Sequence, residues 1–422
     1  MTASSTPSTR NLPDVAVIGG GIVGTATAAA LSAAGARVVL YEAGPAVAAA
    51  ASGRNAGEVC HPPDPILGAL YHESLERYRA LAGEPLPDGD VLRVPADPIG
   101  VLELAFDHDL VRRVAASLAE RQPDLRPDVL DPAELRRLEP LLAEGLSAFR
   151  IATGYPVRPA NATAAFASFA VRHGATIETN ARARVWTSGG VARGVEVGGR
   201  RIAAGSVVVA AGPWTPEIVD PSGAWRPIRP VWGVIVEMHL DPAPGHVMGE
   251  LIDEATLLLS RPAGEADDRA GARGAAASAG TRPAGSAGDL PAPILGINPA
   301  PPRADGSVAP MALGGTLAPA EPDAHRVAPT LVRHAQRFLP SLHEGQAGAV
   351  RTCARPQAFD GRPLIGFVPG IEGLVVAAGN GAWGISTGPA TGRLAADVVL
   401  AGSDAGVPGE LRAGRFGSAS RG

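Results

Sequence analysis

The residues with the clearest chemical meaning are six consecutive ones near the N-terminus, GGGIVG at 19–24. They fit the pattern G-x-G-x-x-G, in which each glycine has its own task. Gly19 permits a tight turn, Gly21 lets the backbone approach a pyrophosphate, and Gly24 lets a following helix pack closely on the preceding strand. The free amides and positive dipole end of such a helix attract phosphates. The hexad therefore predicts a dinucleotide-binding site.

This site needs a strand before the hexad and a helix after it, and the flanking sequence predicts both. A β-branched run at 15–18 predicts a strand, and good helix formers at 22–34 end at Gly35. A second apolar run at 38–41 predicts a parallel strand, and Glu42 follows it where an acid can bind ribose hydroxyls. This context favours dinucleotide binding over a glycine-rich surface loop, and it leaves FAD and NAD open.

Charge and composition limit the possible partners. The 37 basic and 42 acidic residues form no long run of either sign, so we expect a small-molecule partner and neither nucleic acid nor a membrane. Every basic residue is arginine, which excludes a lysine Schiff base. Two cysteines, Cys60 and Cys353, are too few for a disulfide framework or a zinc site, and no metal is expected. With neither a signal-peptide pattern nor an apolar stretch of ~20 residues, we expect a cytoplasmic protein without a transmembrane segment.

The remaining periodicity predicts an α/β protein with an antiparallel second sheet. Helical patterns lie at 67–81, 107–121 and 160–173, and strand-like runs at 182–186, 207–211, 231–238, 257–259 and 374–377. Residues 262–290 are rich in Ala, Gly, Arg and Asp without apolar periodicity, which predicts a disordered insertion, and flexible tails are expected at 1–11 and 403–422.

Several further segments resemble the FAD-dependent D-amino acid oxidase and dehydrogenase superfamily, the DAO family, which includes glycine oxidase, sarcosine oxidase and D-amino acid dehydrogenases. The similar segments are ASGRNAG at 51–57, GYPVRP at 154–159 with GATI at 174–177, VVVAAGPW at 207–214, RPQAFDGRPLIG at 355–366, GLVVAAG at 373–379 and GPATG at 388–392. The resemblance covers about 13–225 and 350–400, and 225–349 matches only loosely.

The resemblance implies a discontinuous Rossmann-like FAD-binding domain of the glutathione-reductase type, formed by 12–90, 150–224 and 350–402. An inserted antiparallel-sheet substrate domain would comprise 91–149 and 225–349. A helix from about 387 to 400 would direct the amides near 383–386 at the N1/C2 carbonyl edge of the flavin, where a helix N-terminus stabilises negative charge.

The same resemblance, together with the hexad, assigns a set of cofactor-binding residues that spans the chain. These are Gly19, Gly21, Ile22, Val23, Gly24, Glu42, Ala43, Ser52, Arg54, Asn55, Ala56, Gly57, Ala183, Ala211, Gly212, Trp214, Arg355, Trp383, Gly384, Ile385 and Ser386.

Three residues near the flavin invite a chemical role, each with a structural alternative. By resemblance, Arg355 binds the substrate carboxylate, unless it pairs with an acid such as Asp360. Cys353 stands at the spacing at which sarcosine-oxidase-type relatives attach flavin covalently, although its neighbours favour non-covalent FAD and a buried thiol. His61 could accept a proton or donate a hydrogen bond, or it could pack in a proline-braced turn.

The resemblance implies oxidation of the C–N bond of a small amine or amino acid, with hydride transfer to flavin N5 and hydrolysis of the imine. The absence of lysine disfavours an oxidase that uses lysine to react with oxygen, and leaves O2 or another electron acceptor open. Two alternatives remain: oxidation of a 2-hydroxy acid with His61 as the base, and a flavin subunit of a heteromeric dehydrogenase complex. Homo- or hetero-oligomers are compatible with each.

Overall fold

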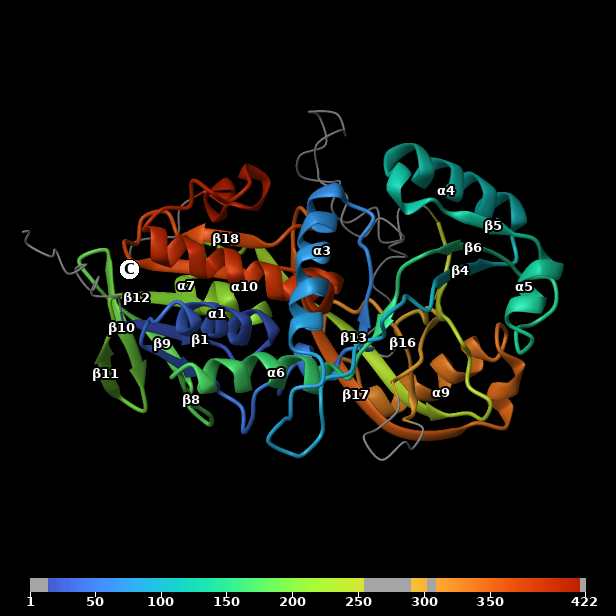
Figure 1. The fold of residues 1–422 in the computed structure, drawn as a ribbon, viewed down its shortest axis with the longest axis horizontal. Helices are drawn as coiled ribbons and strands as arrows, with labels where there is room; N and C mark the ends of the chain where they lie inside the picture. Colours follow the sequence, from blue (N-terminus) through green and yellow to red (C-terminus); the bar gives the residue numbers. More distant parts are fainter. Residues whose placement is uncertain (1–13, 254–289, 302–308, 418–422) are drawn as a thin grey trace, which may run out of the picture.

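A computed structural model of the chain describes residues 14–253, 290–301 and 309–417. Two halves lie side by side along the long axis, one built on a parallel sheet and the other on a larger, mainly antiparallel sheet (Figure 1). This arrangement confirms the predicted α/β fold class with a Rossmann-like half and a separate second sheet.

The parallel sheet draws its strands from separated parts of the chain. Its order is β18-β19-β12-β1-β2-β8, and β18 alone among these described strands runs antiparallel to its neighbour. The runs predicted at 15–18 and 38–41 are its central strands, because their apolar side chains are buried on both faces. The strands are β1 (Val15–Ile18), β2 (Val38–Tyr41), β8 (Thr176–Glu178), β12 (Ser206–Val209), β18 (Leu364–Phe367) and β19 (Leu374–Ala378).

Helices cover one face of this sheet and a small sheet covers the other. The helices are α1 (Ile22–Ala33), α3 (Pro65–Ala80), α6 (Pro159–Arg172) and α10 (Gly384–Ala401), which share one apolar core with the parallel strands. The three-stranded sheet is β9 (Ala183–Ser188), β10 (Val191–Val197) and β11 (Arg200–Ala203), and it packs on a second core. Shorter elements here are α2 (Ala51–Arg54), α7 (Thr215–Val219), and the paired strands β3 (Glu58–Val59) and β7 (Tyr155–Pro156).

The large sheet has the order β17-β13-β16-β15-β14-β4-β6-β5. Its pairs are antiparallel except for β14 with β4. Helices α5 (Pro132–Leu138) and α9 (Ala324–Ala335) pack on one face, and α4 (His108–Arg121) covers one end of the other. The strands are β4 (Val101–Ala105), β5 (Asp128–Leu130), β6 (Ser147–Ile151), β13 (Ile228–His239), β14 (Val247–Glu250), β15 (Gly296–Asn298), β16 (Met311–Gly314) and β17 (Gln346–Ala358).

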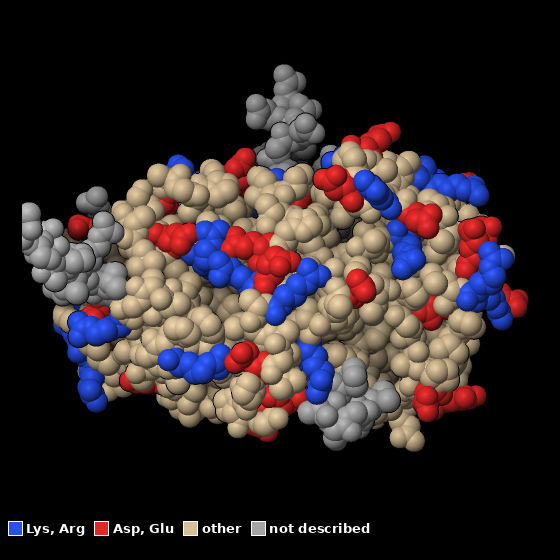
Figure 2. Space-filling model, viewed as in Figure 1, with Lys and Arg blue, Asp and Glu red and all other residues tan. Residues whose placement is uncertain are grey.

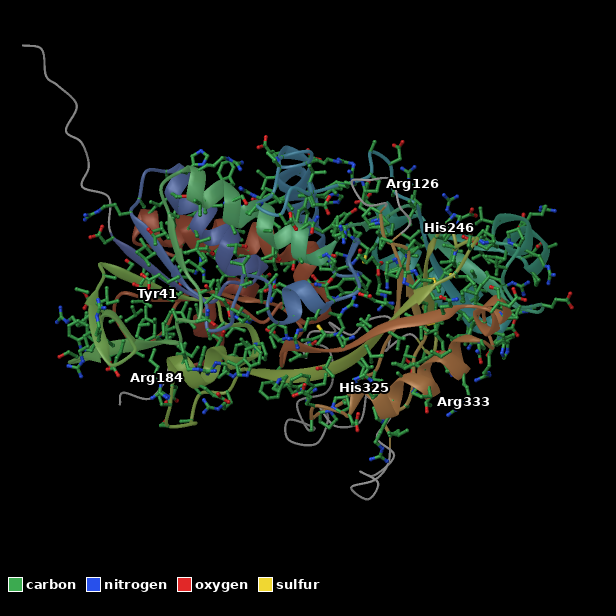
Figure 3. All side chains as sticks on the ribbon, turned by 90° about the horizontal axis from the view of Figure 1, so that it is seen from below. Tyr41, Arg126, Arg184, His246, His325 and Arg333 are labelled. Atoms are coloured by element: carbon green, nitrogen blue, oxygen red, sulfur yellow. The ribbon has the colours of Figure 1, made fainter. Side chains whose placement is uncertain are left out.

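Figure 3 views the two halves from below, with Tyr41 and Arg184 on the parallel-sheet side and His246 and Arg333 on the large-sheet side. Strand β17 belongs to the large sheet, so the division predicted at 350 lies within a continuous strand. The runs predicted at 257–259 and most of 262–290 lie outside the described residues, as does 1–11.

The tail predicted at 403–422 is wrong for its described part, because residues 403–417 pack against the parallel-sheet half. Leu411 and Ala413 are buried, and Arg412 bridges to Ile365 of β18. The Arg415 guanidinium donates to both carboxylate oxygens of Asp360, at 2.6 and 3.0 Å. These long-range contacts hold a segment whose composition alone suggests a tail.

Charges of both signs are interspersed over the face shown in Figure 2. Helices α3 and α10 are linked by Arg393, whose Nε lies 2.6 Å from Glu73 Oε1. Among the described residues, no helix is long and apolar enough to span a membrane.

The contact between α1 and β1 should tolerate no side chain at Gly24, because a Cβ atom there would lie 1.9 Å from the Gly19 carbonyl oxygen. We expect Gly24→Ala to lower the free energy of unfolding by about 3 kcal/mol or more and to weaken retention of a bound dinucleotide. Urea unfolding and the absorption spectrum of the purified protein measure both effects. Gly406→Ala is the matched control, because nothing lies within 4 Å of a Cβ there. Equal stability of the two variants would contradict this packing role.

Candidate active site

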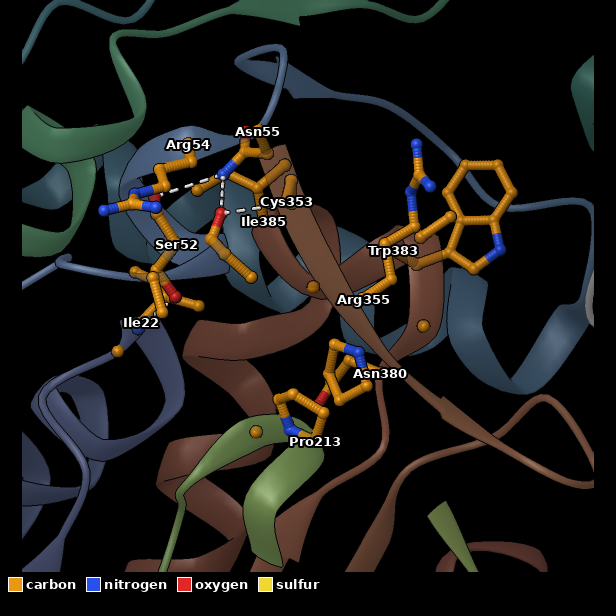
Figure 4. A pocket seen from close by; sticks show the side chains of 18 of the residues that line it. Ile22, Ser52, Arg54, Asn55, Pro213, Cys353, Arg355, Asn380, Trp383 and Ile385 are labelled. Atoms are coloured by element: carbon orange, nitrogen blue, oxygen red, sulfur yellow. Dashed lines mark hydrogen bonds between the residues drawn. The ribbon is translucent and has the colours of Figure 1, made fainter. Parts of the chain in front are cut away.

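An elongated cavity of about 1180 Å³ lies between the two halves of the molecule. It begins at the carboxyl ends of β1 and β2 and continues over the face of the large sheet. In Figure 4, Ile22, Ser52 and Arg54 lie on one side of it, and Arg355 and Trp383 lie on the other. All residues predicted to bind the cofactor or to act on substrate line this cavity except Gly24, whose role is the close contact between α1 and β1.

The hexad places the N-terminus of α1 in the cavity wall. Gly19 has a φ of +112°, and a Cβ atom there would lie 2.4 Å from the Ala210 carbonyl oxygen. Helix α1 begins directly after Gly21, with no acidic residue in its first turn. The positive end of the helix dipole therefore meets the cavity without a compensating charge from that turn.

Glu42 joins two loops at this end of the cavity. Its carboxylate accepts from the Gly20 amide through Oε2 and from the Gly44 amide through Oε1, each at 2.6 Å. Each oxygen has a further lone pair, so both can also accept from ribose hydroxyls.

The segment 51–57 forms the next part of the wall, and contacts from several elements fix it. The Ile22 amide donates to Ser52 Oγ at 2.9 Å, and the Gly57 amide donates to Asn55 Oδ1 at 2.8 Å. From β17, the Arg351 guanidinium donates to the backbone oxygens of Arg54 and Asn55 at 3.1 and 3.2 Å. Arg351 is a positioning residue that the sequence analysis missed, because only strand pairing brings β17 to this loop.

A second helix N-terminus meets the cavity at α10. This helix begins at Gly384, three residues before the predicted start, and its first turn also has no acidic residue. The Ser386 hydroxyl accepts from the Cys60 amide at 3.0 Å, and the buried Asn380 amide donates to Thr387 and Thr391 at 2.9 Å. These bonds fix the start of the helix beside the cavity.

Arg355 extends from β17 into the cavity. A Cβ atom on Gly233 would lie 2.6 Å from both terminal nitrogens of Arg355, so the absence of a side chain at 233 leaves room for the guanidinium. Its Nη1 donates to the Thr316 carbonyl oxygen at 3.0 Å. Within the described part of the chain, no carboxylate forms an ion pair with it, and burial lowers its pKa. The alternative partner Asp360 is excluded, because that carboxylate binds Arg415.

Cys353 lies two residues before Arg355 and is 4 % exposed. Its sulfur lies 3.9 Å from the backbone oxygen of Ala51, to which the thiol donates. Burial raises the pKa of the thiol, although Arg355, Arg351 and Arg54 act in the opposite direction. A protonated thiol is a weak nucleophile, so this environment favours the buried-thiol interpretation.

His61 packs on α3 and also lines the cavity. A Cβ atom on Gly68 would lie 2.6 Å from its ring carbon Cε1, and the Tyr71 ring lies at 5.0 Å, edge to face. His61 Nδ1 lies 2.7 Å from the Pro62 carbonyl oxygen, so the neutral ring holds its proton on Nδ1 and leaves Nε2 as an acceptor. Burial lowers the pKa of His61, which favours the neutral ring.

Two carboxylates of the cavity wall were missed by the sequence analysis. Glu58 belongs to β3 and Glu103 to β4. Burial and the neighbouring Glu58 carboxylate raise the pKa of Glu103 to about 7, and burial also raises the pKa of Glu58. Neither residue belongs to a recognisable motif. Only folding brings Glu58 and Glu103 together, so no local signal in the sequence could have found them. Among the described residues, no group of three or more potential metal ligands is present.

The donor set fits FAD. Gly19 and Gly24 allow the close approach that brings the start of α1 to the cavity, the α1 terminus can hold a pyrophosphate, and Glu42 can bind ribose. The second helix terminus, at α10, lies farther along the same cavity, where a flavin ring would extend.

Comparison with known proteins agrees with this donor set. A family model described as FAD-dependent oxidoreductase matches residues 14–398. Glycine oxidase from Bacillus licheniformis is 26% identical over 407 residues, which cover 93% of this chain and 94% of that protein. Glycine oxidase from Pseudomonas aeruginosa is 27% identical over 406 residues, covering 91% of this chain and 94% of that protein.

Solved structures share the fold. Glycine oxidase from Geobacillus kaustophilus matches with a TM-score of 0.73 and 24% identity, covering 97% of this chain and 99% of that chain. L-Proline dehydrogenase from P. horikoshii also matches with a TM-score of 0.73, at 18% identity and with the same coverage.

The buried Glu103 carboxylate should make stability fall as pH rises. Its pKa is about 7 in the folded protein against 4.5 for an ordinary glutamate. Between these two pH values the folded state keeps a proton that the unfolded state releases, so the free energy of unfolding falls as the pH rises through this range. We expect Glu103→Gln to raise the free energy of unfolding by at most roughly 3 kcal/mol at pH 8, and by much less at pH 5. Urea unfolding at both pH values measures this.

Glu120→Gln on the exposed surface of α4 is the control, and it should change stability little at either pH. A Glu103→Gln protein that is less stable than the wild type at pH 8 would show that the carboxylate has a stabilising partner in the folded state.

Proposed function

The chain belongs to the family of FAD-dependent oxidoreductases, and from this premise we propose that it oxidises the C–N bond of a small amine or amino acid. The observation that carries the proposal is Arg355, a guanidinium in the cavity wall without an ion-pair partner among the described residues. A guanidinium in this state attracts a carboxylate, which it can bind through two parallel hydrogen bonds. The glycine oxidases similar to this chain, by their name, act on an amino acid.

FAD, when bound, supplies an acceptor for the hydride, which carries both electrons of the substrate C–H bond. The chain's residues orient and enclose the reactants. Arg355 fixes the carboxylate, and the terminus of α10 provides a positive dipole end for negative charge that develops beside it. The neutral His61 ring leaves Nε2 as an acceptor, but this nitrogen lies against Gly68 of α3, 2.8 Å from the Cβ position there, so the amine oxidation is assigned no base at His61. The imine product leaves for hydrolysis in water, with O2 or another acceptor taking the electrons.

The role of Arg355 is tested with the FAD-loaded protein under anaerobic conditions. We expect Arg355→Ala to lower kcat/KM for an amino acid about 100-fold, equivalent to ~3 kcal/mol, because the charged hydrogen bonds to the carboxylate are lost. The rate of flavin bleaching measures the effect. An alkylamine that lacks the carboxylate should react equally with variant and wild type. Arg229→Ala is the matched control, because this exposed arginine of β13 contacts the Phe359 ring outside the cavity.

The substrate panel separates the alternatives. An amino acid should bleach the flavin faster than the 2-hydroxy acid with the same side chain. Faster bleaching by the hydroxy acid would replace the amine proposal with hydroxy-acid oxidation and His61 as the base. Retention of FAD without reduction by any member of the panel would favour a flavin subunit of a larger complex.

The buried Cys353 thiol, whose pKa is raised by burial, supports non-covalent attachment of FAD. After acid precipitation of the yellow protein, we expect the flavin in the supernatant, for both the wild type and Cys353→Ala. Absorption spectra of pellet and supernatant measure this. A pellet that keeps flavin in the wild type but not in Cys353→Ala would establish a covalent bond at this residue.

A further inference from the structure

The cavity has an acidic end across the large sheet from Arg355. Glu103 projects from β4, and Glu58 lies beside it on β3. In the described part of the molecule, neither carboxylate forms an ion pair with an arginine or histidine, and the Cys60 thiol is the side-chain donor to Glu58. Two half-buried carboxylates placed side by side repel one another, so the pair favours a bound positive charge.

An unpartnered amide oxygen adds to this demand independently. Asn298 of β15 is 6 % exposed, lines the cavity, and its Oδ1 has no hydrogen-bond partner. Its side chain lies on the same face of the sheet as Gly296, two residues earlier, because side chains alternate along a strand. A buried acceptor without a donor requires one from a bound molecule or water.

The sheet between the two ends of the cavity has no side chains in the row beside Glu103. Gly249 of β14 pairs with Glu103, Gly296 of β15 pairs with Gly249, and Gly314 of β16 follows next. A Cβ atom on Gly249 would lie 2.7 Å from Glu103 Oε2, so a side chain there would displace the carboxylate. The bare backbone of this row leaves an open path over the sheet.

The separation of the charged ends follows from the strand spacing. Arg355 Nη2 lies 3.8 Å from the Cβ position of Gly315, next to β16, whereas the Glu103 carboxylate lies over β14. The strands β16 and β14 are two spacings apart in the sheet, or about 10 Å, and the Arg355 guanidinium lies about two residues farther along the strands, at Gly233 and Thr316, so the charged groups are roughly 12 Å apart. An extended amino acid with a cationic side chain, together with a hydrogen-bond length at each end, spans this separation.

We propose that Glu103, supported by Glu58 and Asn298, binds the cationic side chain of the substrate, so that the substrate is a basic amino acid such as a diamino or guanidino acid. This inference rests on the proposed amino acid oxidation and names its substrate class. Arg355 holds the carboxylate and Glu103 the distal cation, so the substrate lies extended over the glycine row with its C–N bond between two anchored ends. Glu103 is a specificity-determining residue and takes no part in the chemical step.

The test compares lysine with norleucine, which has a similar chain length and no terminal charge, each as both enantiomers. Calorimetric titration of the FAD-loaded protein measures the dissociation constant, and anaerobic flavin bleaching measures the rate. We expect the wild type to bind one enantiomer of lysine at least tenfold more tightly than norleucine, and Glu103→Gln to lose this preference while changing norleucine binding less than about threefold. Glu120→Gln is the control and should behave as the wild type.

Three results have different meanings. Equal affinity of the wild type for lysine and norleucine overturns the cation subsite, while bleaching by either still supports amino acid oxidation. A Glu103→Gln variant that slows bleaching by norleucine as much as by lysine also overturns it, because the carboxylate then acts in the chemistry or the fold. Tight, Glu103-dependent binding of lysine without bleaching by any amino acid supports the subsite and refutes the proposed oxidation.

Discussion

The close approach of α1 to its neighbours is the constraint on which the cavity depends. Gly24 brings the helix against the turn at Gly19, and Gly392 of α10 approaches so closely that a Cβ there would lie 2.7 Å from the Val23 oxygen. Two helices packed at this distance direct their N-termini, both without acidic residues in the first turn, at the same cavity. Phosphate and reduced flavin are both negatively charged, so one packing arrangement could serve both ends of a bound FAD.

The large sheet carries charged side chains that lack ion-pair partners among the described residues. Arg355 has no carboxylate partner and Glu103 no cationic one among the described residues, although an ion pair between them would satisfy both. The glycine row and about two strand spacings keep them apart. Such unpaired buried groups reduce stability, and a protein tolerates them where a ligand supplies the missing partner.

Sequence reasoning succeeded where the signal is local. The strands at 15–18 and 38–41 and helix α1 lie within one short βαβ segment, and the structure has them as predicted, with Glu42 directly after the second strand. Arg351, Glu103 and Asn298 could not be found in this way, because their places depend on strand pairs between distant parts of the chain. The segment at 403–417 was misjudged for the same reason, since its order comes from contacts such as Arg415 with Asp360.

The two halves of the molecule therefore shape the cavity in different ways, one through backbone geometry and the other through side chains. The parallel-sheet half depends on backbone geometry at a few glycines, where almost no substitution fits the available space. The large-sheet half depends on which side chains the strand register places on the cavity face, and that face alternates with the core face along every strand. A change at Gly249 or Glu103 would alter the cavity while leaving the apolar core on the opposite face intact. Selectivity for the substrate can thus change with single residues of the sheet, whereas the fold and the cofactor site remain constant.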